Sequence, residues 1–349
     1  MMAKRTRSPL PLLAALAVAR ASVCAPLTSK ERSPIYHILG NTKDGGLENI
    51  NDASGIVLYK GVWHVFHQCC QNHWDHVVSE DLAHWTRVPP PLVPNATDPA
   101  QWYDAHGSWD GSISLLPEGP TILYDVVEGA PPGGKLGGDP PTMAIARAKD
   151  ADDPYLVEWV KDPRNPIDWN GTTGTSFASG IMKSGDHWNF FSEGYRYETR
   201  DETFHVWNRA ENLFGAKANG GQWFFDRPSA PDGVPADPDP KFTHVIASGT
   251  GLFFQLGTYV AENETWAHYE GDDGMYNFAT GYGPKNNWAT AQAAGDGRVL
   301  SVGWVPVAPH SGQHKRAKFP TSKAPFSADF HSFRLIFGRA IISRNGLEA

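Results

Sequence analysis

Apolar and polar positions alternate along most of the chain, in short runs that a turn divides in two. Four stretches share this pattern: residues 54–67, 112–124, 179–191 and 244–254. Alternation with a period of two places successive side chains on opposite faces of a strand, and each central turn contains Gly beside a polar residue. Each stretch therefore predicts a β-hairpin.

The predicted hairpins recur at a long period. Their first residues, 54, 112, 179 and 244, are 58, 67 and 65 residues apart. Residues 76–85 and 143–159 follow the first two hairpins, end on Trp and predict outer strands of the same sheets. Four-stranded units with this recurrence indicate a β-propeller. A β-sandwich is the rival all-β fold, but it usually lacks a long period.

Helical periodicity is nearly absent, because 28 Pro and 35 Gly interrupt the chain at short intervals. Two segments rich in Gly and Pro, residues 126–141 and 227–240, do not fit the strand pattern. At one end of a propeller, loops of this length are candidates for the walls of a binding site.

The first residues have the composition of a secretory signal. A basic stretch at residues 4–7 precedes an apolar run at residues 10–19, and Ala-Arg-Ala at residues 19–21 has the form of a cleavage site. The apolar run is shorter than the roughly 20 residues that cross a membrane. We expect residues 1–25 to be a signal peptide and the protein to be secreted, with no membrane as partner.

Charge and composition indicate which classes of partner the protein is expected to bind. The formal net charge is -8, and the body of the chain has no basic run, so nucleic acid is not an expected partner. The 13 Trp residues suit a packed β fold or a site where rings stack on sugars. Three Asn-x-Thr sequons predict a glycoprotein, and they begin at Asn95, Asn170 and Asn263.

Cysteine and histidine suggest no metal, cofactor or disulfide framework. The three cysteines are Cys24 and the adjacent pair Cys69 and Cys70. Residues 64–76 contain four His, but their spacing matches no zinc site. Alternation also places His64 and His67 on opposite faces of a strand.

Asp52 has two interpretations. It stands in Asn-Asp-Ala-Ser-Gly at residues 51–55, which is ordinary turn chemistry, since Asn and Asp bond to their own backbone and Gly permits a positive φ. The alternative is a catalytic carboxylate at the start of the first hairpin.

Four short motifs follow one another in the first half of the chain: NDASG at residues 51–55, FHQ at 66–68, WDHVVSEDLAHW at 74–85 and GSWDGSIS at 107–114. They resemble WMNDPNG, FYQ, WGHAxSxDLxHW and GxxSGSAT of glycoside hydrolase family 32, the invertases and other β-fructofuranosidases. The resemblance covers residues 35–305, and residues 74–85 are its most specific part.

This resemblance implies a five-bladed β-propeller over residues 35–305. It also implies a retaining reaction on β-fructofuranosyl linkages of sucrose or a fructan, with one carboxylate as nucleophile and another as general acid/base. Asp52 falls on the nucleophile. The positions around the fructosyl unit fall on Asn51, Gln68, Trp74, Trp109 and Asp110.

Other acidic positions depart from the family's pattern. The family binds sugar hydroxyls with an Asp in an RDP motif, and the matching residue here is Ser179. Its general acid is Glu in an ECP motif, and Asp226 stands there. Asp110 replaces a Ser and is a candidate for the missing carboxylate, and Glu193 is a second spare acid.

Family members continue into a second, β-sandwich domain. Residues 306–349 are too few to form it, so we expect the sandwich to be missing and this tail to be a linker or a sandwich start.

Three functions fit these observations, each with a small or polymeric carbohydrate as partner. The first is a secreted hydrolase of β-fructofuranosyl linkages. The second is a related five-bladed furanosidase that acts on arabinan or xylan. The third is a sugar-binding propeller that has lost turnover, as the change at Ser179 would allow. The sequence does not indicate an oligomeric state.

Overall fold

The computed structural model describes residues 38, 40–41, 47–48, 50–69, 73–127, 143–167, 180–192, 195–212, 222–226, 243–248, 253–260, 262–269, 274–275, 289–293, 299–306, 331–336, 341–343 and 346–348. All of them lie in the unit Ile35–Ala349, one of two units into which internal contacts divide the chain. For Asn51, Asp52 and Gln222–Asp226 the description covers the backbone. The predicted signal peptide, residues 1–25, lies outside the described residues.

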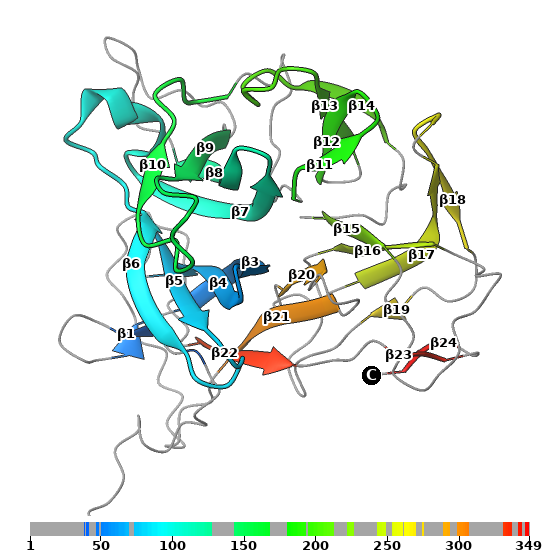
Figure 1. The fold of residues 1–349 in the computed structure, drawn as a ribbon, viewed down its shortest axis with the longest axis horizontal. Helices are drawn as coiled ribbons and strands as arrows, with labels where there is room; N and C mark the ends of the chain where they lie inside the picture. The colour runs from blue at the N-terminus through cyan, green and yellow to red at the C-terminus, as the bar shows by residue number, and fades with distance from the viewer. Residues whose placement is uncertain are drawn as a thin grey trace, which may run out of the picture. The chain divides into compact units, whose positions relative to one another are not determined.

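Antiparallel strands dominate the described residues (Figure 1), and most belong to sheets of three to five strands in which chain neighbours pair. The strands of the large sheets are β3 (Ile50–Tyr59), β4 (Val62–Cys69), β5 (His73–Ser79) and β6 (Thr86–Leu92); β7 (Gly107–Leu116), β8 (Gly119–Val127), β9 (Met143–Ala148) and β10 (Trp159–Lys161); β11 (Met182–Ser184), β12 (His187–Ser192), β13 (Tyr195–Thr199) and β14 (Asn208–Asn212); β15 (Gln222–Asp226), β16 (His244–Ser248), β17 (Phe253–Val260), β18 (Thr265–His268) and β19 (Gly274–Met275); β20 (Ala289–Ala293), β21 (Val299–Pro306) and β22 (His331–Ile336).

Smaller elements complete the description. Two short strand pairs are β1 (Gly40–Asn41) with β2 (Leu47–Glu48), and β23 (Ile341–Ser343) with β24 (Gly346–Glu348). The described residues contain one short helix, η1 (Pro99–Asp104), which Asp98 caps. Within the described part of the chain, no helix is long and apolar enough to span a membrane.

Neighbouring sheets contact one another mainly through their first strands. β3 lies against β7, β15 lies against β12 and β20, and both β20 and β21 lie against β3. Between the second and third sheets, the Ile181 amide donates to Ser114 Oγ over 2.7 Å. The large sheets thus follow one another in chain order and the last contacts the first, as a propeller requires. The all-β prediction is confirmed, and the number of blades stays a prediction.

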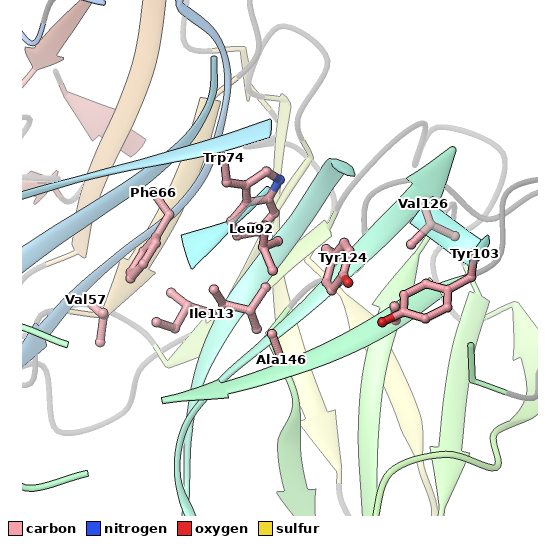
Figure 2. Packing of buried hydrophobic residues seen from close by; sticks show 11 residues of the cluster. Val57, Phe66, Trp74, Leu92, Tyr103, Ile113, Tyr124, Val126 and Ala146 are labelled. Atoms are coloured by element: carbon pink, nitrogen blue, oxygen red, sulfur yellow. The ribbon is translucent and has the colours of Figure 1, made fainter. Parts of the chain in front are cut away.

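The hydrophobic core lies between these sheets, and buried apolar side chains cover both faces of the first sheet. One cluster joins Phe66 and Trp74 of the first sheet to Ile113, Tyr124 and Ala146 of the second (Figure 2). A second cluster packs the other face of the first sheet against Leu300 of β21. A third joins the second and third sheets around Phe190 and Trp207. These clusters hold adjacent sheets against one another.

All four predicted hairpins are present, as β3–β4, β7–β8, β11–β12 and β16–β17. The fourth is not equivalent to the others, because β16 and β17 are the second and third strands of a sheet that begins with β15. Alternation identifies a hairpin without showing its place in a sheet. The similar spacing of the four hairpins therefore did not reflect equivalent strands.

The outer strand predicted at residues 76–85 is wrong beyond residue 79. β5 ends at Ser79, a turn occupies residues 80–85, and β6 begins at Thr86. Ser79 Oγ accepts a hydrogen bond from the Leu82 amide over 2.8 Å, so the hydroxyl turns the chain out of the strand.

Within the described residues this capped turn recurs twice, each time between the third and fourth strands of a sheet. The three capped turns are residues 79–85, 153–159 and 201–207. Each begins with a Ser or Asp whose side chain accepts from nearby backbone amides. Three residues later comes a buried apolar residue with positive φ, and six residues later comes Trp. The buried residues are Leu82 (φ 63°), Leu156 (φ 50°) and Phe204 (φ 62°).

The C-terminal tail contributes to the last large sheet. β22, which lies within residues 306–349, pairs with β21 along its whole length. This sheet therefore extends past residue 305, the limit predicted for the propeller.

Cys69 takes part in a disulfide bond. Its partner lies outside the described residues. The sequence contains two other cysteines, so this single bond is compatible with the expected lack of a disulfide framework.

Candidate active site

The ladder between β3 and β4 contains a bulge at the residues predicted to carry the chemistry. Ile50 pairs with Cys69 and Ala53 pairs with His67, so two residues, Asn51 and Asp52, oppose Gln68 alone. An extra residue bends a strand and redirects its side chains, which is why bulges are common beside active sites. Asp52 thus lies in a strand that is locally irregular, rather than in the plain turn of the first interpretation.

A bulge of the same form interrupts the ladder between β7 and β8. Ser108 pairs with Val126 and Gly111 pairs with Tyr124, so Trp109 and Asp110 oppose Asp125 alone. In both sheets the bulge is in the first strand and faces the second.

A side-chain hydrogen bond connects the two bulges. Gln68 Nε2 donates to Asp110 Oδ1 over 2.7 Å. Gln68 and Asp110 retain 9% and 8% of their exposure, whereas their neighbours His67 and Trp74 retain none. This bond brings two predicted site residues together from different sheets.

Trp74 is the cross-strand partner of Gln68 and lies next to this pair. Its ring packs between Phe66 and Tyr124, with ring centroids 6.4 Å away on each side (Figure 2). Its Nε1 donates to the carbonyl of Trp109, the first residue of the second bulge. Because Trp74 is completely buried, its indole orients the backbone of the bulge. Direct contact with a substrate stays a prediction.

Two glycines allow the strands to approach closely. A Cβ at Gly55 would lie 2.6 Å from Ile113 Cγ2, so β3 and β7 meet at this point because no side chain separates them. A Cβ at Gly111 would lie 2.7 Å from Tyr124 Cα and 3.0 Å from Trp74 Cζ2. Gly111 therefore permits Trp74 to pack beneath the second bulge.

Histidines occupy both faces of β4 next to Gln68. A hydrogen bond of 2.9 Å joins His64 Nδ1 and His76 Nε2, on the face that contains Phe66. On the other face, His67 Nε2 lies 4.0 Å from Asp75, which also pairs with Arg87. Burial lowers the pKa of His64 and of His67 to about 4, and that of His76 well below its usual value. The three rings are therefore neutral at neutral pH.

The remaining predicted residues are described in part or not at all. Asp226 is the last residue of β15, pairs with His244, and is described by its backbone. Ser179 and Glu193 lie outside the described residues, although Gly180 lies against Ser114. Among described side chains, no group of three or more His, Cys, Asp or Glu is arranged to hold a metal ion.

Sequence reasoning missed Asp125. It is 1% exposed and opposes the second bulge as Gln68 opposes the first. The available signal was a carboxylate inside the apolar strand at residues 121–127 (TILYDVV), since a buried acid in such a strand requires partners.

Residues 46–176 match the model of the Glycosyl hydrolases family 32 N-terminal domain. The resemblance to family 32 is confirmed. The matched segment contains β3 to β10, and so both bulges and the Gln68–Asp110 bond.

Several curated relatives are beta-fructofuranosidases by name. An insoluble beta-fructofuranosidase isoenzyme of Arabidopsis thaliana is 31% identical over 193 residues, which are 50% of this chain and 30% of that protein. Insoluble isoenzyme 1 of Daucus carota is 28% identical over 311 residues, which are 74% of this chain and 50% of that protein. The chain therefore spans half or less of the length of these relatives.

Solved structures of family 32 share the fold. Fructan 1-exohydrolase IIa from Cichorium intybus aligns with a TM-score of 0.58 at 23% identity, over 78% of this chain and 54% of that one. A variant of the same exohydrolase in complex with 1-kestose aligns with a TM-score of 0.57 at 24% identity. At this identity the likeness shows the fold alone.

Proposed function

We propose that this protein is a glycoside hydrolase that cleaves β-fructofuranosyl linkages in sucrose or a fructan with retention of configuration. The observation that carries the proposal is the family match over residues 46–176, since this segment contains both bulged strands and the bond that joins them. The relatives named for beta-fructofuranosidase activity support the same substrate class.

Asp52 and Asp226 have separate roles in the reaction, as nucleophile and as general acid/base. The Asp52 carboxylate attacks the anomeric C2 of the fructosyl unit while Asp226 gives a proton to the departing glycosidic oxygen, so one C–O bond forms as another breaks. Asp226 then takes a proton from water, whose oxygen attacks C2, releases fructose and frees Asp52. The bulge at residues 51–52 supports this role for Asp52, because bulges are common beside active sites.

Binding of the fructosyl unit falls to residues around the two bulges. Gln68 and Asp110 present hydrogen-bonding groups. Asn51 and Trp109 precede the acids in their bulges, and the Trp74 indole donates to the Trp109 carbonyl. Ser179 completes the set from the segment before β11.

The five successive large sheets support a five-bladed propeller that includes residues 35–305 and β22. We propose in addition that the protein is secreted and glycosylated. Asn95 and Asn263 are exposed, and in each sequon the Thr hydroxyl donates to the Asn Oδ1, over 2.8 Å and 2.6 Å. Asn170 lies outside the described residues.

The test measures fructose release from sucrose, inulin, levan and arabinan by the wild type, Asp52→Asn and Asp226→Asn. We expect release from a fructoside, reduced by about 1,000-fold or more in Asp52→Asn. Asp81→Asn is the matched control, because Asn keeps the capping oxygen of an exposed turn.

Equal release by the wild type and Asp52→Asn contradicts the proposed role of Asp52. Release from arabinan alone contradicts the proposed substrate. Binding of sucrose without any release identifies a sugar-binding protein instead.

A further inference from the structure

The first two sheets place an acid at equivalent points of their first strands. Asp52 is the second residue of the bulge opposite Gln68, and Asp110 is the second residue of the bulge opposite Asp125. β7 then pairs regularly with β8, whereas β3 shifts register a second time, between Ala53 and Gly55, before it pairs regularly with β4. The second sheet thus repeats the two-residue bulge that contains Asp52 in the first.

Two contacts fix how these strands lie. Gly55 meets Ile113, and Gln68, which faces residues 51–52, bonds to Asp110. Asp52 is three residues before Gly55, and Asp110 is three residues before Ile113. β3 and β7 therefore run side by side in the same direction here, and their acids lie at the same end.

The surroundings of Asp110 hold it in one place. Gln68 donates to its Oδ1, Trp74 donates to the carbonyl of the preceding residue, and the backbone of Gly111 packs closely against Tyr124 and Trp74. An ionised carboxylate accepts several hydrogen bonds, so the bond from Gln68 is compatible with further donors such as sugar hydroxyls. Preorganised acceptors of this kind bind hydroxyls at little cost in side-chain entropy.

We propose that Asp110 binds the hydroxyl groups of the fructosyl unit beside Asp52, and supplies the carboxylate that Ser179 does not. This assignment rests on the proposed function. If Asp110 binds the substrate, a carboxylate at another position of the site can take over part of its role. If Asp110 only stabilises the fold, such a carboxylate cannot replace it.

The experiment compares the wild type with Asp110→Asn and Asp110→Ser in two assays: hydrolysis of sucrose, and calorimetric titration with fructose. We expect Asp110→Ser to lower kcat/KM by about 100-fold, because charge-assisted hydrogen bonds to substrate are lost. The affinity for fructose falls by about 10-fold or more for the same reason. Asp110→Asn keeps the shape of the side chain and shows whether charge is required.

Two further variants separate binding from folding. Asp75→Asn also alters a buried acid next to β4, but on the opposite face, so it changes thermal stability and leaves kcat/KM near that of the wild type. Ser179→Asp in the Asp110→Ser background restores part of the lost kcat/KM, which a purely structural role would not allow.

The outcomes distinguish this assignment from the proposed function. An active wild type with unchanged kcat/KM and affinity in Asp110→Ser overturns the assignment alone. A wild type that binds fructose without hydrolysing sucrose overturns the hydrolysis, and the titrations of Asp110→Asn then decide the role of Asp110. A wild type with neither property overturns both.

Discussion

The capped turns are specified by residues close together in the sequence, whereas each of the two bulges depends on pairing with a second strand. A capped turn depends on residues within seven positions of one another: a cap, a buried residue at positive φ and a Trp. A bulge depends on the strand opposite, because the extra residue exists only relative to a partner. The turns join strands, and the bulges contain Asp52 and Asp110.

The motif that most specifically resembles family 32 lies largely in one of these turns. Residues 74–85 are the most specific part of the resemblance to family 32, yet from Ser79 onward they form a capped turn. The same turn at residues 153–159 and 201–207 shows that it serves the architecture of a sheet. The less specific motifs, at residues 51–55 and 107–114, contain the bulges.

The largest expected effect comes from filling the space beneath the second bulge. Gly111→Ala places a methyl group against Leu123 O, 2.7 Å from Tyr124 Cα and near the Trp74 ring. Since backbone cannot move aside cheaply, we expect the free energy of unfolding to fall by about 3 kcal/mol. Urea denaturation measures it.

Gly180→Ala is the control for this change. Its Cβ would meet Ser114 Oγ at 3.5 Å, an ordinary contact, so stability stays near that of the wild type. Equal losses in the two variants would show that the close packing at Gly111 is not the cause.

A smaller effect is expected from breaking a capped turn. Asp201 accepts from the amides of Thr203, His205 and Val206, so Asp201→Ala leaves these donors without their cap. We expect a loss of about 2 kcal/mol in the free energy of unfolding, with kcat/KM of the folded protein unchanged. Asp201→Asn retains an acceptor and loses less. A fall in kcat/KM at temperatures where Asp201→Ala remains folded would show that this turn takes part in the site and does more than join strands.

Acid should weaken the sheet that holds the first bulge. Burial lowers the pKa of His64 and His67 to about 4, against about 6.5 in an unfolded chain, so unfolding takes up protons between these values. The groups that face them are His76 and Asp153 for His64, and Asp75, Arg87 and His73 for His67. Stability is therefore full above pH 6.5 and falls as pH drops toward 4.

Thermal denaturation across this pH range measures the effect. We expect His64→Leu to show a shallower decline than the wild type, because one buried group no longer titrates. His106→Gln alters an exposed histidine and should follow the wild type. A wild type with constant stability from pH 6.5 to 4 would contradict neutral burial of these rings.

Much of the architecture was readable in the sequence, because alternation and Gly turns are local. The hairpins β3–β4 and β7–β8 lie where the pattern placed them. The capped turns are equally local, but 79, 153 and 201 are unevenly spaced, so a search for a fixed period misses them.

The site was predictable in part. Resemblance pointed to Gln68 and Asp110, which the structure brings into contact. It could not indicate that Trp74 is completely buried, or that Asp125 opposes the second bulge, since burial and register depend on strands distant in the chain.

The role of Asp52 as nucleophile is tested most directly by trapping the fructosyl unit on the first bulge. Asp226→Ala is incubated with an aryl β-fructofuranoside, whose leaving group needs no acid, so the covalent intermediate accumulates because its hydrolysis lacks a base. The quenched protein is digested and mapped by mass spectrometry. We expect one fructosyl unit on the peptide that contains Asp52 and none in the Asp52→Asn, Asp226→Ala double variant. A fructosyl unit on another peptide, or aryl release that is unaffected by Asp52→Asn, would show that Asp52 is not the nucleophile.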